Sequence, residues 1–324
     1  MMDNNGLIHG LLLDGNGAAR ELGWDEINSW QASDGILWIH LNYTSPAALN
    51  WLYEKSNLDH LIVEALISEE ARPRSTVIGK STLLTLRGIN HNPGADFEDM
   101  VSLRIWAEEQ RIITTRQRPL LSVTDLKNQL IQGKGPVSAS HLIISITEFL
   151  TSYIERALDG IESTTSELEE QISSSCDETL RTQISSMRRN VIILRRYLAP
   201  QREAISRIQI DSVSWFTEKD KRQLHEIANI LIRVVEDLDS LRDRTSVARE
   251  EFTNALSAQL NSRLYFLSII TAIFLPLSFF TGLLGINVGG IPGASYKWAF
   301  LIVVFLLMGI GICQYFYFRK KDWI

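Results

Sequence analysis

The run Leu264–Leu284 reads LYFLSIITAIFLPLSFFTGLL and contains no Asp, Glu, Lys, Arg or His. A second uncharged run, Trp298–Phe318, reads WAFLIVVFLLMGIGICQYFYF. A transmembrane helix needs about 20 predominantly apolar residues, so each run is long enough to cross a bilayer core. The segment that joins them, Gly285–Lys297, is rich in glycine and carries one charge, on Lys297. Because this connection is short, the two spans must be antiparallel. The sequence therefore predicts a two-helix C-terminal transmembrane hairpin.

Basic residues flank the hairpin on its outer ends. Arg263 precedes the first span, and Arg319, Lys320 and Lys321 follow the second. The excess of Lys and Arg in cytoplasmic segments places both ends of the hairpin, and hence both termini, in the cytoplasm. The segment Met1–Gly10 lacks the basic start and apolar run of a signal peptide. We therefore expect a multi-pass membrane protein with its large N-terminal portion in the cytoplasm.

The composition excludes several classes of function. The chain has 324 residues, 45% of them hydrophobic, and a formal net charge of −6, which argues against nucleic acid as the main partner. Its two cysteines, Cys176 and Cys313, are too few for a disulfide framework or a cysteine-based zinc site. We find no pairing of a nucleophile with a base, and no paired carboxylates. The sequence therefore predicts neither an enzyme nor a bound cofactor.

The predicted fold class is α+β, in four parts. Residues 1–136 form a cytoplasmic α/β domain, residues 137–263 a helical stalk, residues 264–318 the transmembrane hairpin and residues 319–324 a cytoplasmic tail. The segment Gly133–Pro136 marks the first boundary. Apolar runs and turn residues predict strands at Ile8–Leu13, Ile36–Leu41, Ser81–Ile89, Met100–Ala107 and Arg111–Arg116, and helices at Ala47–Ser56, Leu58–Glu70 and Ser122–Leu130.

Beyond Ser138, apolar residues recur at helical spacing. A first helix extends to about Ile172, and a second runs from Thr179 to Leu198 with Pro200 near its end. A third helix begins near Thr217, an N-cap with Asp220 three residues on, and meets no proline before Pro276. The stalk and the first span are therefore predicted to form one helix, roughly 100 Å long at 1.5 Å per residue. So long a helix needs partners along its length.

Small and hydroxyl residues line one face of the first span, and two interpretations remain open. Ser268, Thr271, Leu275, Ser278 and Gly282 form the stripe. Such residues let membrane helices pack closely. They also suit a narrow polar path for ions. Because two helices cannot enclose an aqueous path, transport would require several copies of the chain around a central axis.

The bend of the hairpin contains the motif Gly285-Ile286-Asn287. The Asn287 amide oxygen is a neutral, hard ligand, and the neighbouring glycines let backbone carbonyls face an ion. In an oligomer, each Asn287 would contribute one oxygen to a ring at the pore mouth. Rings of carbonyl-type oxygens are a known way to select cations. Gly285 and Asn287 are therefore the candidate metal-binding residues.

Two C-terminal spans, the first ending in Gly-x-Asn after a long stalk helix, resemble the CorA superfamily of divalent-cation transporters. That family's signature is Gly-Met-Asn, and its usual Met-Pro-Glu-Leu is replaced here by Ile291-Pro292-Gly293-Ala294. The run from Gly285 to Gly293 is similar to the ZntB zinc-transporter branch. Further stretches that resemble this branch are Trp38–Tyr43, Arg72–Arg74, Thr115–Arg118 and Arg195–Arg202.

The resemblance implies a funnel-shaped homopentamer in the cell inner membrane, with the α/β domains at its cytoplasmic mouth. Gly285 and Asn287 would form the outer ion site. The implied pore-lining residues are Leu264, Leu267, Thr271, Leu275, Ser278 and Gly282. The implied cargo is Zn²⁺, moved inward with proton coupling. Oxygen ligands alone suit hydrated Mg²⁺, Co²⁺ or Ni²⁺ as well, so a channel-like magnesium transporter of the CorA type is an alternative.

Several other features have plainer explanations. The six histidines show no ligand spacing and are predicted to be structural or surface residues. The stalk carboxylates alternate with arginines, which favours a solvated, salt-bridged helix face. The basic cluster of Arg188, Arg189, Arg195 and Arg196 could bind anionic lipid or acidic stalk residues of a neighbouring copy, and we favour the second. A different class of function, a membrane-anchored interaction or sensor protein, would have no use for Asn287 at the bend.

Overall fold

The computed structural model describes residues 6–69, 72–95, 99–172, 177–211, 213–286, 291, 293 and 295–321. The chain divides into two compact units, Met1–Arg249 and Glu250–Ile324. The predicted boundaries after residues 136 and 263 remain predictions, because this division does not test them.

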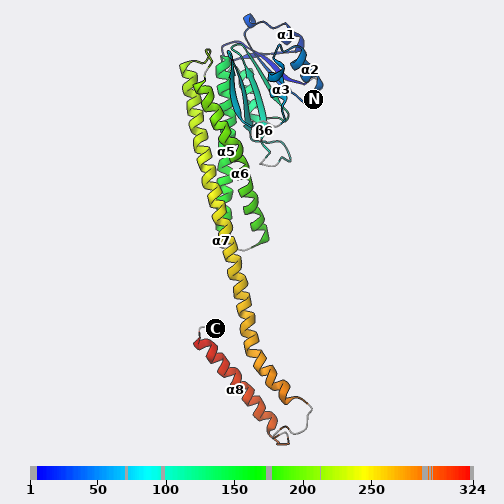
Figure 1. Cartoon of the computed structure of the whole chain (residues 1–324), viewed down its shortest axis with the longest axis vertical. Helices are drawn as coiled ribbons and strands as arrows, with labels where there is room; N and C mark the ends of the chain where they lie inside the picture. The colour runs from blue at the N-terminus through cyan, green and yellow to red at the C-terminus, as the bar shows by residue number, and fades with distance from the viewer. Residues whose placement is uncertain are drawn as a thin grey trace. The chain divides into compact units, whose positions relative to one another are not determined.

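The first unit contains a seven-stranded sheet (Figure 1). Its strands are β1 (Leu7–Leu13), β2 (Ala19–Leu22), β3 (Ile36–Asn42), β4 (Arg74–Ile78), β5 (Ser81–Gly88), β6 (Val101–Ala107) and β7 (Arg111–Arg116). Their order is β2-β1-β3-β7-β6-β5-β4, with β3 and β7 parallel and the other neighbours antiparallel. The five predicted strands are confirmed to within a residue or two. The edge strands β2 and β4 were not predicted, since each buries a single residue and lacks an alternating apolar pattern.

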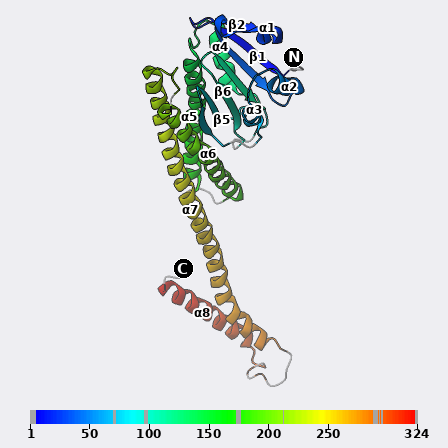
Figure 2. The same ribbon diagram turned by 45° about the horizontal axis from the view of Figure 1, so that its top comes forward.

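Helices cover both faces of the sheet (Figures 1 and 2). On one face lie α1 (Trp24–Ser29), α2 (Pro46–Glu54) and α3 (His60–Ile67), with a short 3₁₀ turn at Ala32–Asp34. On the other lie α4 (Leu121–Ile131), α5 (Ala139–Ile172) and α6 (Glu178–Ile210). Successive strand residues point to opposite faces. In β3, Leu37 and Ile39 join the α1–α3 core, whereas Trp38 joins the other. The sheet therefore separates two hydrophobic cores.

Helix α6 continues beyond the proline that was predicted to lie near its end. It runs through Pro200 to Ile210. A proline inside a helix costs about 3 kcal/mol because one backbone hydrogen bond is lost. Here the following turns bury Ala204 and Ile205, and the buried Gln201 side chain accepts a hydrogen bond from the Arg87 backbone N–H at 2.7 Å. Tertiary packing offsets the proline, so the predicted end at Leu198 was wrong.

Helix α7 (Glu218–Leu284) is one continuous element, as predicted. A capping box opens it: the Thr217 N–H donates to Asp220 Oδ2 at 2.8 Å, and the Asp220 N–H donates to Thr217 Oγ1 at 3.2 Å. Within the first unit its apolar stripe packs against α5 and α6 in shared clusters that include Leu224, Leu231 and Leu238. The chain's own α5 and α6 therefore supply partners for the stalk.

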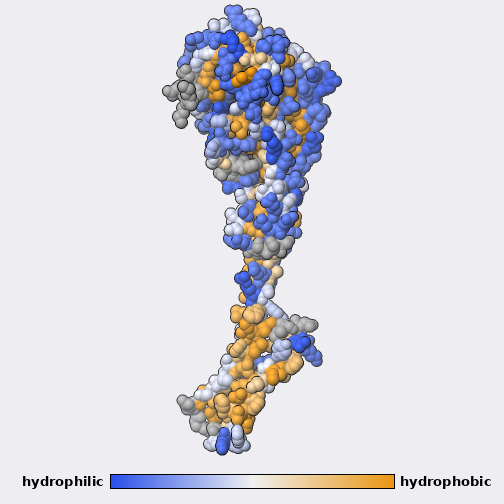
Figure 3. All heavy atoms as spheres, turned by 180° about the vertical axis from the view of Figure 1, so that it is seen from behind, coloured by the Kyte–Doolittle hydropathy of each residue, from blue (hydrophilic) through white to orange (hydrophobic). Residues whose placement is uncertain are grey.

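The second unit contains the last part of α7 and α8 (Ala299–Lys320). Both helices are long and apolar enough to cross a membrane, and the apolar windows are not buried inside the chain. Figure 3 shows hydrophobic residues gathered over this unit. The two helices coincide with the spans expected from the sequence.

Candidate ion pathway

The predicted pore-lining residues occupy the face of α7 that turns away from α8. We call Leu264, Leu267, Thr271, Leu275, Ser278 and Gly282 the pathway face. All six are exposed in the single chain, with Leu264 at 62%, Leu267 at 59% and Leu275 at 68%. The partly buried residues of the span are Ile269, Ala272, Ile273, Pro276 and Leu277. At 100° per residue the two sets point about 160° apart.

Helix α8 packs against the partly buried residues of the first span of α7. Its own partly buried residues recur at helical spacing: Val303, Val304, Leu307, Ile310, Gly311 and Gln314. The Gln314 side-chain amide lies 3.5 Å from the Ala272 carbonyl oxygen, which fixes the two faces against each other. The pathway face is thus left for lipid or for other copies of the chain.

The hydroxyl groups of Ser268 and Thr271, near this face, donate hydrogen bonds to backbone carbonyls of their own helix. Ser268 Oγ donates to the Leu264 carbonyl at 2.8 Å, and Thr271 Oγ1 donates to the Leu267 carbonyl at 2.9 Å. A hydroxyl that donates in this way keeps acceptor lone pairs on its oxygen. Both residues are exposed. Their oxygens can therefore accept further hydrogen bonds, for example from water.

Gly285 closes the C-terminal end of α7. Its N–H donates to the Thr281 carbonyl at 2.9 Å and to the Gly282 carbonyl at 3.2 Å. A Cβ at Gly285 would lie 2.9 Å from the Thr281 oxygen, so this close approach requires glycine. The C-terminus of a helix carries a partial negative charge of about half a unit and unpaired carbonyls. This end of α7 therefore attracts cations. Asn287 lies outside the described residues, and its role remains a prediction.

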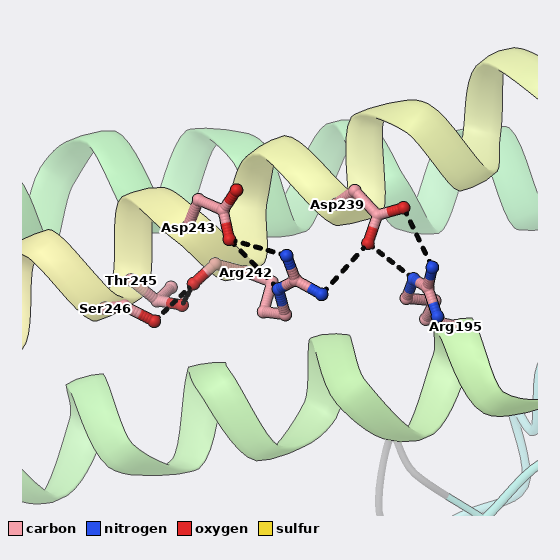
Figure 4. Close-up of polar contacts among 6 residues, drawn as sticks. All are labelled: Arg195, Asp239, Arg242, Asp243, Thr245 and Ser246. Atoms are coloured by element: carbon pink, nitrogen blue, oxygen red, sulfur yellow. Dashed lines mark hydrogen bonds and ion pairs between the residues drawn. The ribbon is translucent and has the colours of Figure 1, made fainter.

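The stalk carboxylates are held by arginines of the same chain. Asp239 accepts hydrogen bonds from Arg195 at 2.5 and 3.1 Å and lies 3.4 Å from Arg242, which also pairs with Asp243 at 2.8 Å (Figure 4). The salt-bridged stalk face is confirmed at these positions. Arg195 therefore meets an acidic stalk residue, as predicted, but Asp239 comes from α7 of the same chain and not from a neighbouring copy.

A second ion pair ties α7 to α5. Arg244 donates to Glu169 at 2.6 and 3.0 Å, and these hydrogen bonds to the carboxylate raise the pKa of the Arg244 guanidinium. Among the residues that the structure describes, no group of three or more His, Cys, Asp or Glu side chains could hold a metal ion.

Two histidines that look unrelated in the sequence lie side by side. His9 and His40 are register partners on β1 and β3, and their ring centroids are 4.9 Å apart. Burial lowers the pKa of His9 to about 3, and the charges of Lys127 and Arg116 add to the effect. Burial also lowers the pKa of His40 well below its usual value. Arg116 Nε donates to His40 Nε2 at 3.0 Å. Both rings are neutral near pH 7 and serve the core rather than an ion site.

The pathway face, the capped end of α7 and the antiparallel span beside it can be compared with known proteins. The family model described as CorA-like Mg²⁺ transporter protein matches residues 33–320. The chain belongs to the CorA family. The resemblance inferred from the Gly-Ile-Asn motif and its flanking stretches is confirmed.

Relatives of known name match this CorA-family chain over nearly its whole length. It is 39% identical to the divalent cation transporter CmaX of Pseudomonas aeruginosa, over 99% of this chain and 98% of that protein. It is 33% identical to the zinc transport protein ZntB of Pectobacterium atrosepticum, over 100% and 98%.

Solved structures share its fold. The full-length CmaX structure superposes with a TM-score of 0.85 at 39% identity, over 99% of each chain. The CorA magnesium transporter of Methanocaldococcus jannaschii superposes with a TM-score of 0.84 at 17% identity, over 100% of each. The latter likeness speaks for the fold alone.

Proposed function

We propose that this CorA-family chain is one subunit of a homo-oligomeric divalent-cation transporter of the inner membrane. The ion passes along a central pore lined by the pathway face of α7. One observation carries the proposal: the face that bears the hydroxyls and ends at Gly285 is turned away from α8 and left uncovered in the single chain. An ion pathway built between copies requires such a face.

The assembly we propose is a funnel-shaped homopentamer with both termini in the cytoplasm. Two helices cannot enclose water, so several α7 helices must surround one axis. The antiparallel α8 helices then lie outside that ring, because α8 packs on the opposite side of α7 from the pathway face. Arg263 and the basic residues after Phe318 support the orientation. The mass of the purified complex in a native measurement tests the number of subunits.

Zinc is the cargo that we propose, supported by the ZntB relatives. The oxygen atoms that the described pathway offers to an ion belong to hydroxyl and carbonyl groups. Such ligands suit a hydrated divalent ion and hold it weakly enough for release. Mg²⁺, Co²⁺ and Ni²⁺ are therefore competitors in the test. The two spans contain no Asp, Glu or His, so proton coupling would use a group elsewhere. Glu250 and Glu251, exposed on α7, are the nearest carboxylates that precede the first span.

Liposomes loaded with a metal-sensitive dye test the proposal. Zinc or magnesium is added outside, with and without an inward proton gradient, to wild-type protein and to Asn287→Ala. We expect zinc influx that rises with the proton gradient and falls at least tenfold in the variant, since a ring of carbonyl oxygens at the mouth is lost. The matched control is Asn254→Ala, which removes the same amide from an exposed position on α7.

The other outcomes are equally informative. Magnesium influx that does not depend on the proton gradient would overturn the proposal of a proton-coupled zinc transporter and favour a channel-like magnesium transporter of the CorA type. Flux no greater than that of empty vesicles would overturn transport altogether. The hairpin would then serve as a membrane anchor for an interaction or sensor domain.

A further inference from the structure

A proline interrupts the hydrogen bonds of α7 inside its apolar run. Pro276 has no N–H, so the carbonyl of Ala272, four residues earlier, loses its donor within the helix. In the hydrocarbon core of a bilayer no water replaces that donor, and each unpaired backbone group is costly. Some other group must therefore satisfy the Ala272 carbonyl, or the helix must carry the cost.

Gln314 of α8 supplies the donor. It is the only amide side chain in the run Trp298–Phe318. Its Nε2 lies 3.5 Å from the carbonyl oxygen of Ala272, the same carbonyl that Pro276 leaves open. Ala272, Pro276 and Gln314 are all partly buried between the two helices. The small Ala272 side chain lets α8 approach closely at this point.

The hydrogen bond from Gln314 to Ala272 is long, and only one end of the Gln314 amide has a partner. A distance of 3.5 Å is at the outer limit for a hydrogen bond to a carbonyl. Gln314 Oε1 is buried and accepts no hydrogen bond from any described residue. A glutamine in this position has no packing advantage over leucine or methionine in lipid. Its amide is explained by the open carbonyl opposite.

We propose that Gln314 is a positioning residue that takes the place of the missing N–H of Pro276 and holds the interrupted turn of α7 against α8. Thr271 and Leu275 each immediately precede one of the two residues involved, and both belong to the pathway face. A turn held from the α8 side fixes where these two side chains point on the other side. The link to ion flux rests on the proposed function, whereas the hydrogen bond itself does not.

A double-mutant cycle tests the proposal on the full-length protein in lipid nanodiscs and liposomes. Gln314→Met removes the donor and keeps the length of the side chain. Pro276→Ala gives residue 276 an N–H that can close the helix on Ala272, so Gln314 becomes redundant. Gln314→Met should lower the Tm by roughly 2–4 °C and cut zinc flux about threefold. In the Pro276→Ala background it should change neither.

Equal losses from Gln314→Met in both backgrounds would overturn the proposal, because glutamine would then act independently of the open carbonyl. Tyr315→Phe is the matched control, since it removes a polar group from the exposed side of the same turn. Its Tm and flux should equal those of the wild type.

Two further arrangements keep the test decisive. If Pro276→Ala does not assemble, Gln314→Asn serves instead: its amide is one methylene shorter and should fall short of Ala272, so a wild-type Tm and flux would overturn the proposal. The Tm measurement does not need transport. Coupling between residues 276 and 314 in a protein without flux would uphold the hydrogen bond and its hold on α7 while rejecting the proposed function.

Discussion

The two ends of α7 present the same residue type in opposite surroundings. In the first unit, Leu224, Leu231 and Leu238 are 0% exposed and pack against α5 and α6. In the second unit, Leu264, Leu267 and Leu275 are 59–68% exposed. The first group gains its stability by leaving water within one chain. The second group of leucines has no such partner within the chain, so only lipid or other copies of the chain can cover it.

Polar groups show the same contrast. In the first unit, Asp239 of α7 is paired with Arg195 of α6, and Arg244 of α7 with Glu169 of α5. In the second, Thr271 bonds to its own backbone, and the open Ala272 carbonyl depends on Gln314. The comparison teaches that the first unit buries its apolar residues within one chain, whereas the second unit leaves the pathway face of α7 uncovered in the single chain.

The largest expected effect comes from truncating the same residue type at both ends of α7. Leu238→Ala should lower the free energy of unfolding by about 2–5 kcal/mol, because a fully buried side chain leaves a cavity. Leu275→Ala should leave the unfolding transition nearly unchanged and alter ion flux instead. Thermal unfolding and liposome flux, measured on both variants, check this. Equal destabilisation by the two would break the comparison.

The histidine pair makes the first unit sensitive to acid. The folded pKa of His9 is about 3, below its ordinary value of 6.5. Above pH 6.5, His9 is neutral in both the folded and the unfolded chain and does not make stability depend on pH. Below pH 6.5, His9 binds a proton in the unfolded chain but stays neutral in the folded one, which favours unfolding. Stability should therefore fall by about 2 kcal/mol between pH 7 and pH 5 from His9 alone. His40 adds to this loss.

Unfolding followed by tryptophan fluorescence measures this pH dependence, and one contributor is Trp38, whose ring centroid is 4.5 Å from that of His9. His9→Phe should make the loss of stability between pH 7 and pH 5 smaller by the contribution of His9, while that of His40 remains. His60→Phe, at an exposed histidine, should keep the wild-type slope because His9 is still present. A slope unchanged by His9→Phe would contradict the assignment.

The end of α7 tests the second unit at backbone level. Gly285→Ala brings a Cβ to 2.9 Å from the Thr281 carbonyl oxygen, so the backbone must shift, at a cost of about 1–3 kcal/mol. Flux should fall with it, since the same turn leads to the predicted pore mouth. Gly282→Ala meets no heavy atom within 4 Å and should leave the Tm unchanged or higher. Flux and Tm are measured for both variants. Equal values for Gly285→Ala and Gly282→Ala would mean that the turn at Gly285 does not require glycine.

The smallest effect should come from the ion pairs of the stalk. Arg195 and Asp239 are 41% and 35% exposed, so Arg195→Met should cost only about 0.2–1 kcal/mol, and less at high salt. Arg196→Met, on the exposed side of the same turn, is the control. A double-mutant cycle with Asp239→Asn measures the pair. Coupling well above this range would mean that charge, and not apolar packing, holds the stalk together.

Local signals were enough to predict much of this protein from its sequence. The two uncharged runs, the capping box at Thr217 and the continuous helix from there to Leu284 depend on neighbours in the chain. The stripe of small and hydroxyl residues from Ser268 to Gly282 follows from helical spacing, whereas Leu264 and Leu267 were implied by the family resemblance. The motif Gly285–Asn287 with its flanking stretches indicated the CorA family. These features depend on periodicity, charge and length, which a sequence carries directly.

Only the tertiary structure decided the features that join distant residues. The edge strands β2 and β4 form by pairing with neighbours that already have a core, and α6 passes Pro200 because its later turns are buried. Strand register brings His9 beside His40, and helix packing brings Gln314 to the carbonyl that Pro276 opens. The sequence by itself determined the five inner strands, the long helices and the two spans, because hydrogen bonding within a segment and its apolar pattern are local. Which segments meet was decided by packing in three dimensions, since contact energies between distant residues leave no periodic trace along the chain.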